Sequence, residues 1–96
     1  MTTNVHEEIQ GNPIVEFLYL NTNAEVKLHA QWSEKLSLIW DHAYNELKEA
    51  RKPNDLLECQ NGESLMANLD LTLEQLRDRH LCQGRKFQIR SETGGA

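Results

Sequence analysis

The sequence predicts one α+β domain in which a mixed sheet of four or five strands packs on a single long helix. Short runs rich in branched and aromatic residues lie on both sides of one segment with helical periodicity. At 96 residues the chain is long enough for one domain with a modest core. One helix cannot cover both faces of a sheet, so two layers are the economical arrangement. We expect the domain to span residues 14–90, between a flexible leader (1–13) and a flexible tail (91–96).

Residues 14–20 and 25–30 are expected to form a hairpin. In the first run only Glu16 is charged, and it should face water, whereas the second run alternates apolar with charged or polar residues. Residues 21–23 between them (Asn-Thr-Asn) are typical of a turn. The side chains expected to face the core are Val15, Phe17, Tyr19, Val26, Leu28 and Ala30.

Residues 33–51 are predicted to form the long helix. Ser33 is suited to the N-cap position, and Pro53 should end the helix because proline disfavours a helical conformation in the residue before it. Between them, apolar side chains recur at helical spacing and form a stripe that can pack on the sheet. The stripe consists of Leu36, Ile39, Trp40, Ala43, Leu47 and Ala50, with Tyr44 at its edge.

Residues 55–60 predict another short strand, and residues 64–66 a very short partner for it after the Asn-Gly turn at 61–62. Thr72 and Gln75 have the spacing of a capping box, which predicts a short helical turn over residues 73–79, before the last strand. Five leucines in this region are expected to close the open end of the core: Leu69, Leu71, Leu73, Leu76 and Leu81.

The last predicted strand is Lys86–Arg90, in which Phe87 and Ile89 alternate with polar residues. A central position in the sheet, parallel to the first strand, would bury both apolar side chains. A polar tail that contains Gly94 and Gly95 follows at once. A short tail joined directly to a central strand indicates that the tail is the functional part of the chain.

Charge and composition exclude several classes of function. The net charge is −5 and the basic residues are not clustered, so nucleic acid is not an expected partner. No apolar run is long enough to cross a membrane. Glu7 and Glu8 lie where a signal peptide would carry basic and then apolar residues, which predicts a cytoplasmic protein. In that compartment Cys59 and Cys82 are expected to be reduced rather than joined in a disulfide.

No catalytic or cofactor site is predicted. His80 and Cys82 form one close pair, but no second pair follows at the spacing of a metal site. Ser33, Ser37 and His42 lie on the helix without the carboxylate arrangement that hydrolysis needs. We therefore expect no metal, no cofactor and no enzymatic activity in the chain itself.

The order of elements, the long helix, the leucine-rich segment before the last strand and the Gly94-Gly95 ending resemble the ubiquitin-like β-grasp family over residues 14–95. The resemblance is closest to bacterial ubiquitin-like modifiers encoded beside activating-enzyme, conjugating-enzyme and peptidase genes. It implies a covalent modifier that an activating enzyme converts, with ATP, to an acyl-adenylate and then a thioester. A conjugating enzyme would then join Gly95 to an amine of a target protein through an isopeptide bond.

The resemblance also implies roles for the tail residues. Gly95 would supply the acyl carbonyl, and the two glycines would let the backbone thread a narrow channel. Ala96 would have to be removed by a processing peptidase, which acts on the bond between Gly95 and Ala96. The tail residues that the activating enzyme would recognise are Arg90, Glu92, Thr93 and Gly94.

Two alternatives remain beside the modifier. A sulfur carrier of the same fold would hold a thiocarboxylate at Gly95, although such proteins normally end at the second glycine, without a residue such as Ala96. A non-covalent interaction module would not use the tail. Ubiquitin binds partners through an apolar patch on the outer face of its sheet, and that patch is not clearly reproduced here. The side chains expected on this face are Glu16, Glu58, Lys86, Gln88 and Arg90, with Leu18, Leu20 and Leu56 as its apolar members.

Overall fold

The computed structural model describes residues 13–82 and 85–91. The predicted leader and most of the predicted tail lie outside these residues. The described elements, in chain order, are the strands β1 (Ile14–Tyr19) and β2 (Ala24–His29), the helix α2 (Leu36–Leu47), the strand β3 (Leu56–Cys59), the 3-10 helix η1 (Met66–Asn68), the helix α3 (Leu73–Asp78) and the strand β4 (Lys86–Arg90).

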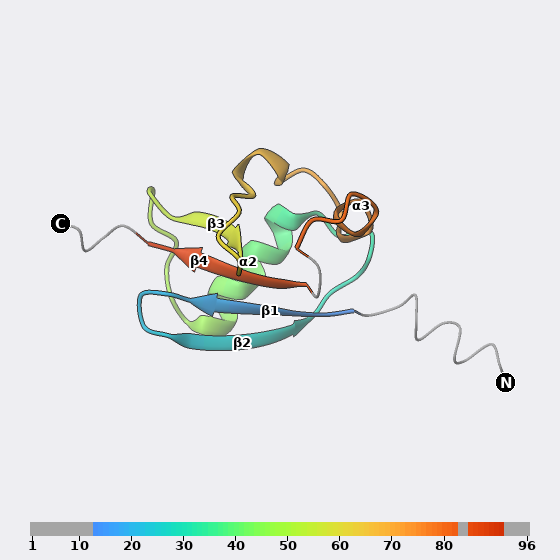
Figure 1. Cartoon of the computed structure of the whole chain (residues 1–96). Helices are drawn as coiled ribbons and strands as arrows, with labels where there is room; N and C mark the ends of the chain where they lie inside the picture. The colour runs from blue at the N-terminus through green and yellow to red at the C-terminus, as the bar shows by residue number, and fades with distance from the viewer. Residues whose placement is uncertain (1–12, 83–84, 92–96) are drawn as a thin grey trace, which may run out of the picture.

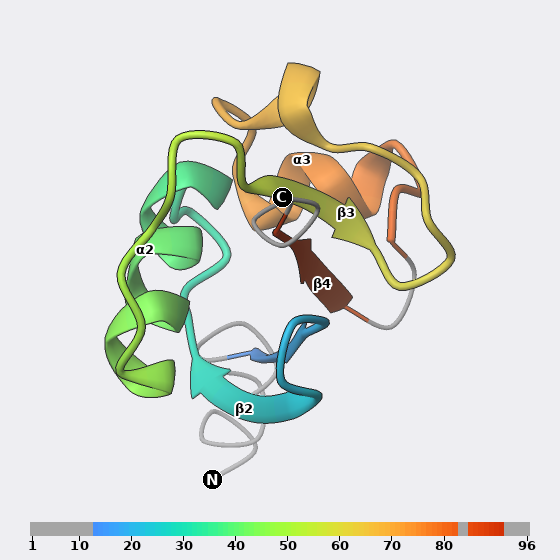
Figure 2. The same ribbon diagram turned by 90° about the vertical axis from the view of Figure 1, so that its left-hand side faces the viewer.

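The four strands form one mixed sheet in the order β2-β1-β4-β3. The β1–β2 and β3–β4 pairs are antiparallel, whereas β1 and β4 are parallel. Figure 1 and Figure 2 show α2 crossing one face of this sheet. The predicted α+β arrangement is confirmed, including the central last strand beside the first. Of the four or five strands predicted, four form. Residues 64–66 add no fifth strand, because only Ser64 forms an isolated bridge, to Glu58, before the chain turns into η1.

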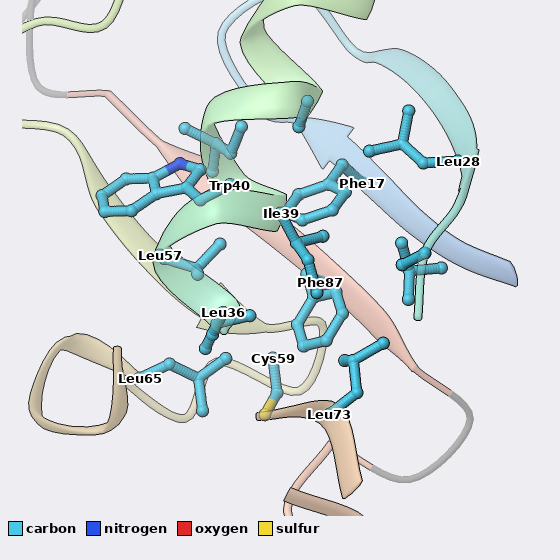
Figure 3. Packing of buried hydrophobic residues seen from close by; sticks show 14 of the residues in the cluster. Phe17, Leu28, Leu36, Ile39, Trp40, Leu57, Cys59, Leu65, Leu73 and Phe87 are labelled. Atoms are coloured by element: carbon cyan, nitrogen blue, oxygen red, sulfur yellow. The ribbon is translucent and has the colours of Figure 1, made fainter. Parts of the chain in front are cut away.

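The core lies between the sheet and α2. Phe17 and Phe87 occupy paired positions on β1 and β4, and their ring centroids lie 5.1 Å apart. Both side chains are buried, and burial of each contributes about 1.5–3 kcal/mol to stability. In Figure 3, Ile39 of α2 lies over the two rings, and Leu73 of α3 lies beside Phe87. Leu73 and Leu76 are buried and the other leucines of this region, Leu69, Leu71 and Leu81, pack against the core, as predicted.

The helix α2 begins later than predicted, and Ser33 is not its N-cap. The N-cap is Lys35, whose side chain makes no capping hydrogen bond. Instead, the backbone N–H of Leu36 donates to the carbonyl of Leu71 (2.8 Å), and the N–H of Ser37 donates to that of Leu69 (3.0 Å). Carbonyl groups from the segment before α3 therefore satisfy helix-terminal amides that a local side chain would otherwise cap.

The helix also ends before it reaches Pro53, so the proline does not terminate it. Its last residue is Leu47, and Lys48 takes a left-handed conformation with φ of 60°. The N–H of Glu49 then donates to the carbonyl of Tyr44 at 3.1 Å, a bond that closes the helix end. The prediction that the helix extends to residue 51 is wrong, and Ala50 is an exposed loop residue rather than part of the buried stripe.

Cys59 and Cys82 form a disulfide, which corrects the prediction that both are reduced. Cys59 ends β3, whereas Cys82 lies in the connection between α3 and β4. Their Cα atoms are 5.2 Å apart, within the usual range for a disulfide, although 23 positions separate them in the sequence. The sequence predicted a cytoplasmic protein with reduced cysteines. The fold instead brings the two sulfur atoms close enough to bond.

No helix among the described residues combines the length and the hydropathy that crossing a bilayer requires.

Candidate functional site

The candidate site is the end of β4, where the C-terminal segment leaves the sheet. Because β4 is a central strand, hydrogen bonds from β1 and β3 hold both of its sides. Arg90 is its last residue and Ser91 follows. Of the predicted site residues, Arg90 is the one that the structure describes; Glu92, Thr93, Gly94, Gly95 and Ala96 lie outside the described residues.

Arg90 forms a bidentate pair with Glu58 of β3. Its Nε donates to one carboxylate oxygen of Glu58 (3.0 Å), and its Nη2 donates to the other (3.2 Å). The Nε2 of Gln88 donates to the same carboxylate at 2.6 Å. The hydrogen bonds from Arg90 are the main reason that the pKa of Glu58 lies below its usual range, since burial acts in the opposite direction. The Arg90 side chain is therefore held against the sheet at the base of the tail.

This pair also changes the prediction for the outer face of the sheet. Glu58 and Gln88 lie on the face away from α2, as predicted, but each is only 7% exposed. The hydrogen bond from Gln88 to Glu58, and those from Arg90 to Glu58, explain how two polar side chains can be buried there. The three apolar residues expected on this face, Leu18, Leu20 and Leu56, are each half-buried.

On the α2 side of the sheet, a buried carboxylate lies beside the start of the tail. Asp55 is 4% exposed, and its Oδ2 accepts from the Tyr44 hydroxyl (2.7 Å) and the backbone N–H of Lys52 (3.0 Å). Asp55 Oδ1 and the Ser91 hydroxyl are both buried without a well-formed hydrogen bond. The Ser91 hydroxyl nevertheless lies close enough to help lower the pKa of Asp55. Asp55 thus connects α2, the loop after it and the first residue of the tail.

The pKa of Asp55 is lowered and that of Tyr44 is raised relative to their ordinary values. Burial acts to raise the pKa of Asp55, but the hydrogen bonds from Tyr44 and Lys52, helped by Ser91 and the Lys52 charge, hold it below its usual value. Burial raises the pKa of Tyr44, and its hydrogen bond to the Asp55 carboxylate raises it further. The pair is therefore a phenol donating to a carboxylate over the neutral range.

Arg51 covers the α2 side of this region. Its guanidinium lies 3.8 Å from the ring centroid of Trp40 and 5.5 Å from that of Tyr44, and it pairs with Asp41 at 3.3 Å. Such a cation over two aromatic faces stabilises their packing.

The arrangement restrains the base of the tail on both faces of the sheet. Within residues 13–82 and 85–91 no three metal-ligating side chains gather as a metal site would need.

Asp55 and Tyr44 were not predicted as hydrogen-bond partners, since eleven positions separate them and nothing in the sequence near either residue indicates pairing. Figure 2 looks at this end of the sheet, with β3 next to β4 and α2 to one side.

No protein-family model matches this chain, and neither does any curated protein sequence.

Proposed function

We propose that the chain is a ubiquitin-like β-grasp modifier that is processed after Gly95 and joined through Gly95 to an amine of a target protein. The main support is the position of β4, which is central, parallel to β1 and followed directly by the glycine-containing tail. A strand held on both sides gives the tail a fixed base. The chain's own residues perform no catalysis in this proposal.

The chemistry explains why a fixed base and a narrow tail belong together. A carboxylate is a poor acyl donor at neutral pH, so Gly95 has to be activated by adenylation and thioester formation on partner enzymes that use ATP. The activating enzyme must bind the folded domain while the tail extends to the bound nucleotide. Two residues without a Cβ allow the backbone to pass through a channel that side chains would block.

The structure describes the base of the proposed reactive tail, at Arg90 and Ser91. Arg90 is paired with Glu58, and Ser91 lies beside Asp55, so the segment is restrained from both faces of the sheet up to Ser91. We propose that the activating enzyme reads Arg90 together with Glu92, Thr93 and Gly94. A tail with Ser91-Glu92-Thr93 before its glycines differs from that of ubiquitin, so enzymes matched to ubiquitin are not expected to accept it.

Mass spectrometry of cells that express the chain with its neighbouring genes tests the proposal. Arg90 is the last basic residue, so trypsin would leave Ser-Glu-Thr-Gly-Gly, residues 91–95, attached to a modified lysine. We expect this remnant on target peptides. A chain that ends at Gly95 should be conjugated without the peptidase, whereas a chain lacking Gly94 and Gly95 should remain unattached.

The other outcomes assign the chain to a different class. If intact mass shows one carboxylate oxygen at Gly95 replaced by sulfur and no remnant is found, the chain is a sulfur carrier. An intact mass that retains Ala96, together with partner binding that survives deletion of residues 92–96, makes it a non-covalent interaction module. Either result overturns the modifier proposal.

A further inference from the structure

At the opposite end of the sheet from the tail, the structure contains a cavity with an apolar floor and a basic rim. Its volume is about 230 Å³. Leu73, Leu76, Leu81 and Phe87 form the floor, and Figure 1 shows α3 at the end of the sheet where β1 and β4 begin. The remaining lining residues are Arg77, His80, Cys82 and Arg85. A basic rim is notable in a chain whose net charge is −5.

The two arginines of the rim are arranged around one tryptophan. The guanidinium carbon of Arg77 lies 4.7 Å from the ring centroid of Trp32, and that of Arg85 lies 5.3 Å from the same ring. Contacts of this kind hold the flat guanidinium groups in place, and the contact with the ring face itself uses none of their N–H donors. Two positive charges are therefore positioned beside the apolar floor.

The rim is attached to the start of β1. Arg85 Nε donates to the carbonyl of Ile14 at 3.2 Å, and the carbonyl of Arg85 accepts from the N–H of Glu16 at 3.1 Å. The start of β1 therefore lies beside the cavity. Twelve residues of sequence precede the described part of the chain.

The charges on the rim are incompletely neutralised. Arg77 pairs with the carboxylates of Glu74 (3.7 Å) and Asp78 (3.5 Å), but all three side chains are more than half exposed, and such surface pairs contribute little. Among the described residues, no carboxylate lies within ion-pair distance of Arg85. A further carboxylate could therefore bind at this rim without displacing a strong partner.

The leader has the complementary chemistry. It contains Val5, Glu7, Glu8 and Ile9, which are two adjacent carboxylates between two aliphatic side chains. Ile9 is five residues from Ile14, so an extended chain can carry it roughly 17 Å from that point. The floor of the cavity is within this reach because Arg85 contacts Ile14 and also lines the cavity.

We propose that the leader folds back on its own domain, with Ile9 in the cavity and the carboxylates of Glu7 and Glu8 on Arg77 and Arg85. Burial of Ile9 against the leucine floor supplies the apolar part of the affinity. The two ion pairs supply orientation, and salt should weaken them because the rim is open to solvent. The proposal concerns residues distant from the tail and does not depend on the proposed function.

The two tryptophans allow the proposal to be tested in the full-length chain by NMR. Trp32 lies at the rim, whereas Trp40 is in the core and 2% exposed, so its indole signal is an internal control. We expect Glu7→Gln/Glu8→Gln and Ile9→Ser to shift the indole resonance of Trp32 and leave that of Trp40 unchanged. The matched control is Glu25→Gln/Glu46→Gln, which changes the net charge equally at two exposed sites away from the cavity.

A spin label identifies the docked segment. A label attached at Thr3→Cys should broaden the methyl signals of Leu76 and Leu81, and Arg85→Gln should remove this broadening, whereas Arg79→Gln on the exposed end of α3 should not. An unchanged Trp32 resonance in both leader variants overturns the proposal. Broadening that grows with protein concentration also overturns it, because the leader would then be bound to a second copy.

Discussion

The two ends of the sheet are held by different interactions. Where β4 ends, two buried carboxylates, Asp55 and Glu58, accept hydrogen bonds from side chains on neighbouring elements. Where β4 begins, leucine packing and the Cys59–Cys82 disulfide join α3 and the following loop to the sheet. The first end depends on protonation state and the second on redox state. Conditions that loosen one end should therefore leave the other locally intact.

The largest effect is expected from loss of the disulfide. The chain-entropy description of a closed loop of this length gives about 3 kcal/mol for the stability lost in Cys82→Ala. We expect a lower urea midpoint for the variant and for the wild-type protein after reduction. Hydrogen exchange should accelerate at α3 and Leu81, while the amides around Asp55 keep their relative protection. If the free energy of unfolding were the same with and without reductant, the disulfide would not be what stabilises the end of the sheet where β4 begins.

Removal of Asp55 should have the next largest effect. Asp55→Ala leaves the buried Tyr44 hydroxyl and the Lys52 N–H without their acceptor, which costs about 2 kcal/mol. Exchange should accelerate at Arg90 and the end of β4 rather than at α3. Asp70→Ala, at an exposed carboxylate, is the matched control and should change stability by less than about 0.5 kcal/mol.

Acid should loosen the tail end by a smaller amount. The pKa values of Asp55 and Glu58 are depressed in the folded state, so their contribution is present above the unfolded values of about 4 and is lost as pH falls through the folded ones. Glu58→Gln should flatten the dependence of the urea midpoint on pH below about 5. The effect is smaller than that of Asp55→Ala because the Arg90 side of the pair is half exposed. An unchanged acid slope in the variant would show that Glu58 is not responsible.

The smallest expected effect is an increase in the free energy of unfolding. Lys48 ends α2 in a left-handed conformation, which glycine adopts without the steric cost of a Cβ. Relief of the left-handed strain, about 1–2 kcal/mol, exceeds the extra entropy that glycine loses on folding, so Lys48→Gly should raise stability by about 0.5–1 kcal/mol. Ala50→Gly, just beyond the helix, serves as the control and should not stabilise. A loss of stability in Lys48→Gly would indicate that the Lys48 side chain contributes more than its backbone conformation costs.

Several parts of the fold were predictable because they depend on neighbours along the chain. The alternation in β1 identified Val15, Phe17 and Tyr19 as core residues, since side chains of a strand point alternately to its two faces. The capping box at α3 was predictable because Thr72 and Gln75 complete it between themselves. The central position of β4 followed from its two apolar residues and the need to bury both.

Other parts were missed because their partners are distant in sequence. Ser33 had the chemistry of an N-cap, but carbonyls of Leu69 and Leu71 satisfy the start of α2 instead. The hydrogen bond between Tyr44 and Asp55 leaves no periodic signal in the sequence. The candidate site was therefore predicted as a tail, while the contacts that hold its base were not predicted.

The sequence by itself determined the identity and spacing of the strands, the buried stripe of α2 and the glycine pair that follows the last strand. These features arise from backbone geometry and apolar periodicity, which act over a few residues. Only the tertiary structure decided that Cys59 meets Cys82, that Asp55 lies beside Ser91 and that two arginines flank Trp32 above an apolar cavity. Such contacts depend on the path of the whole chain, because they join side chains that only the assembled sheet and helices bring within reach.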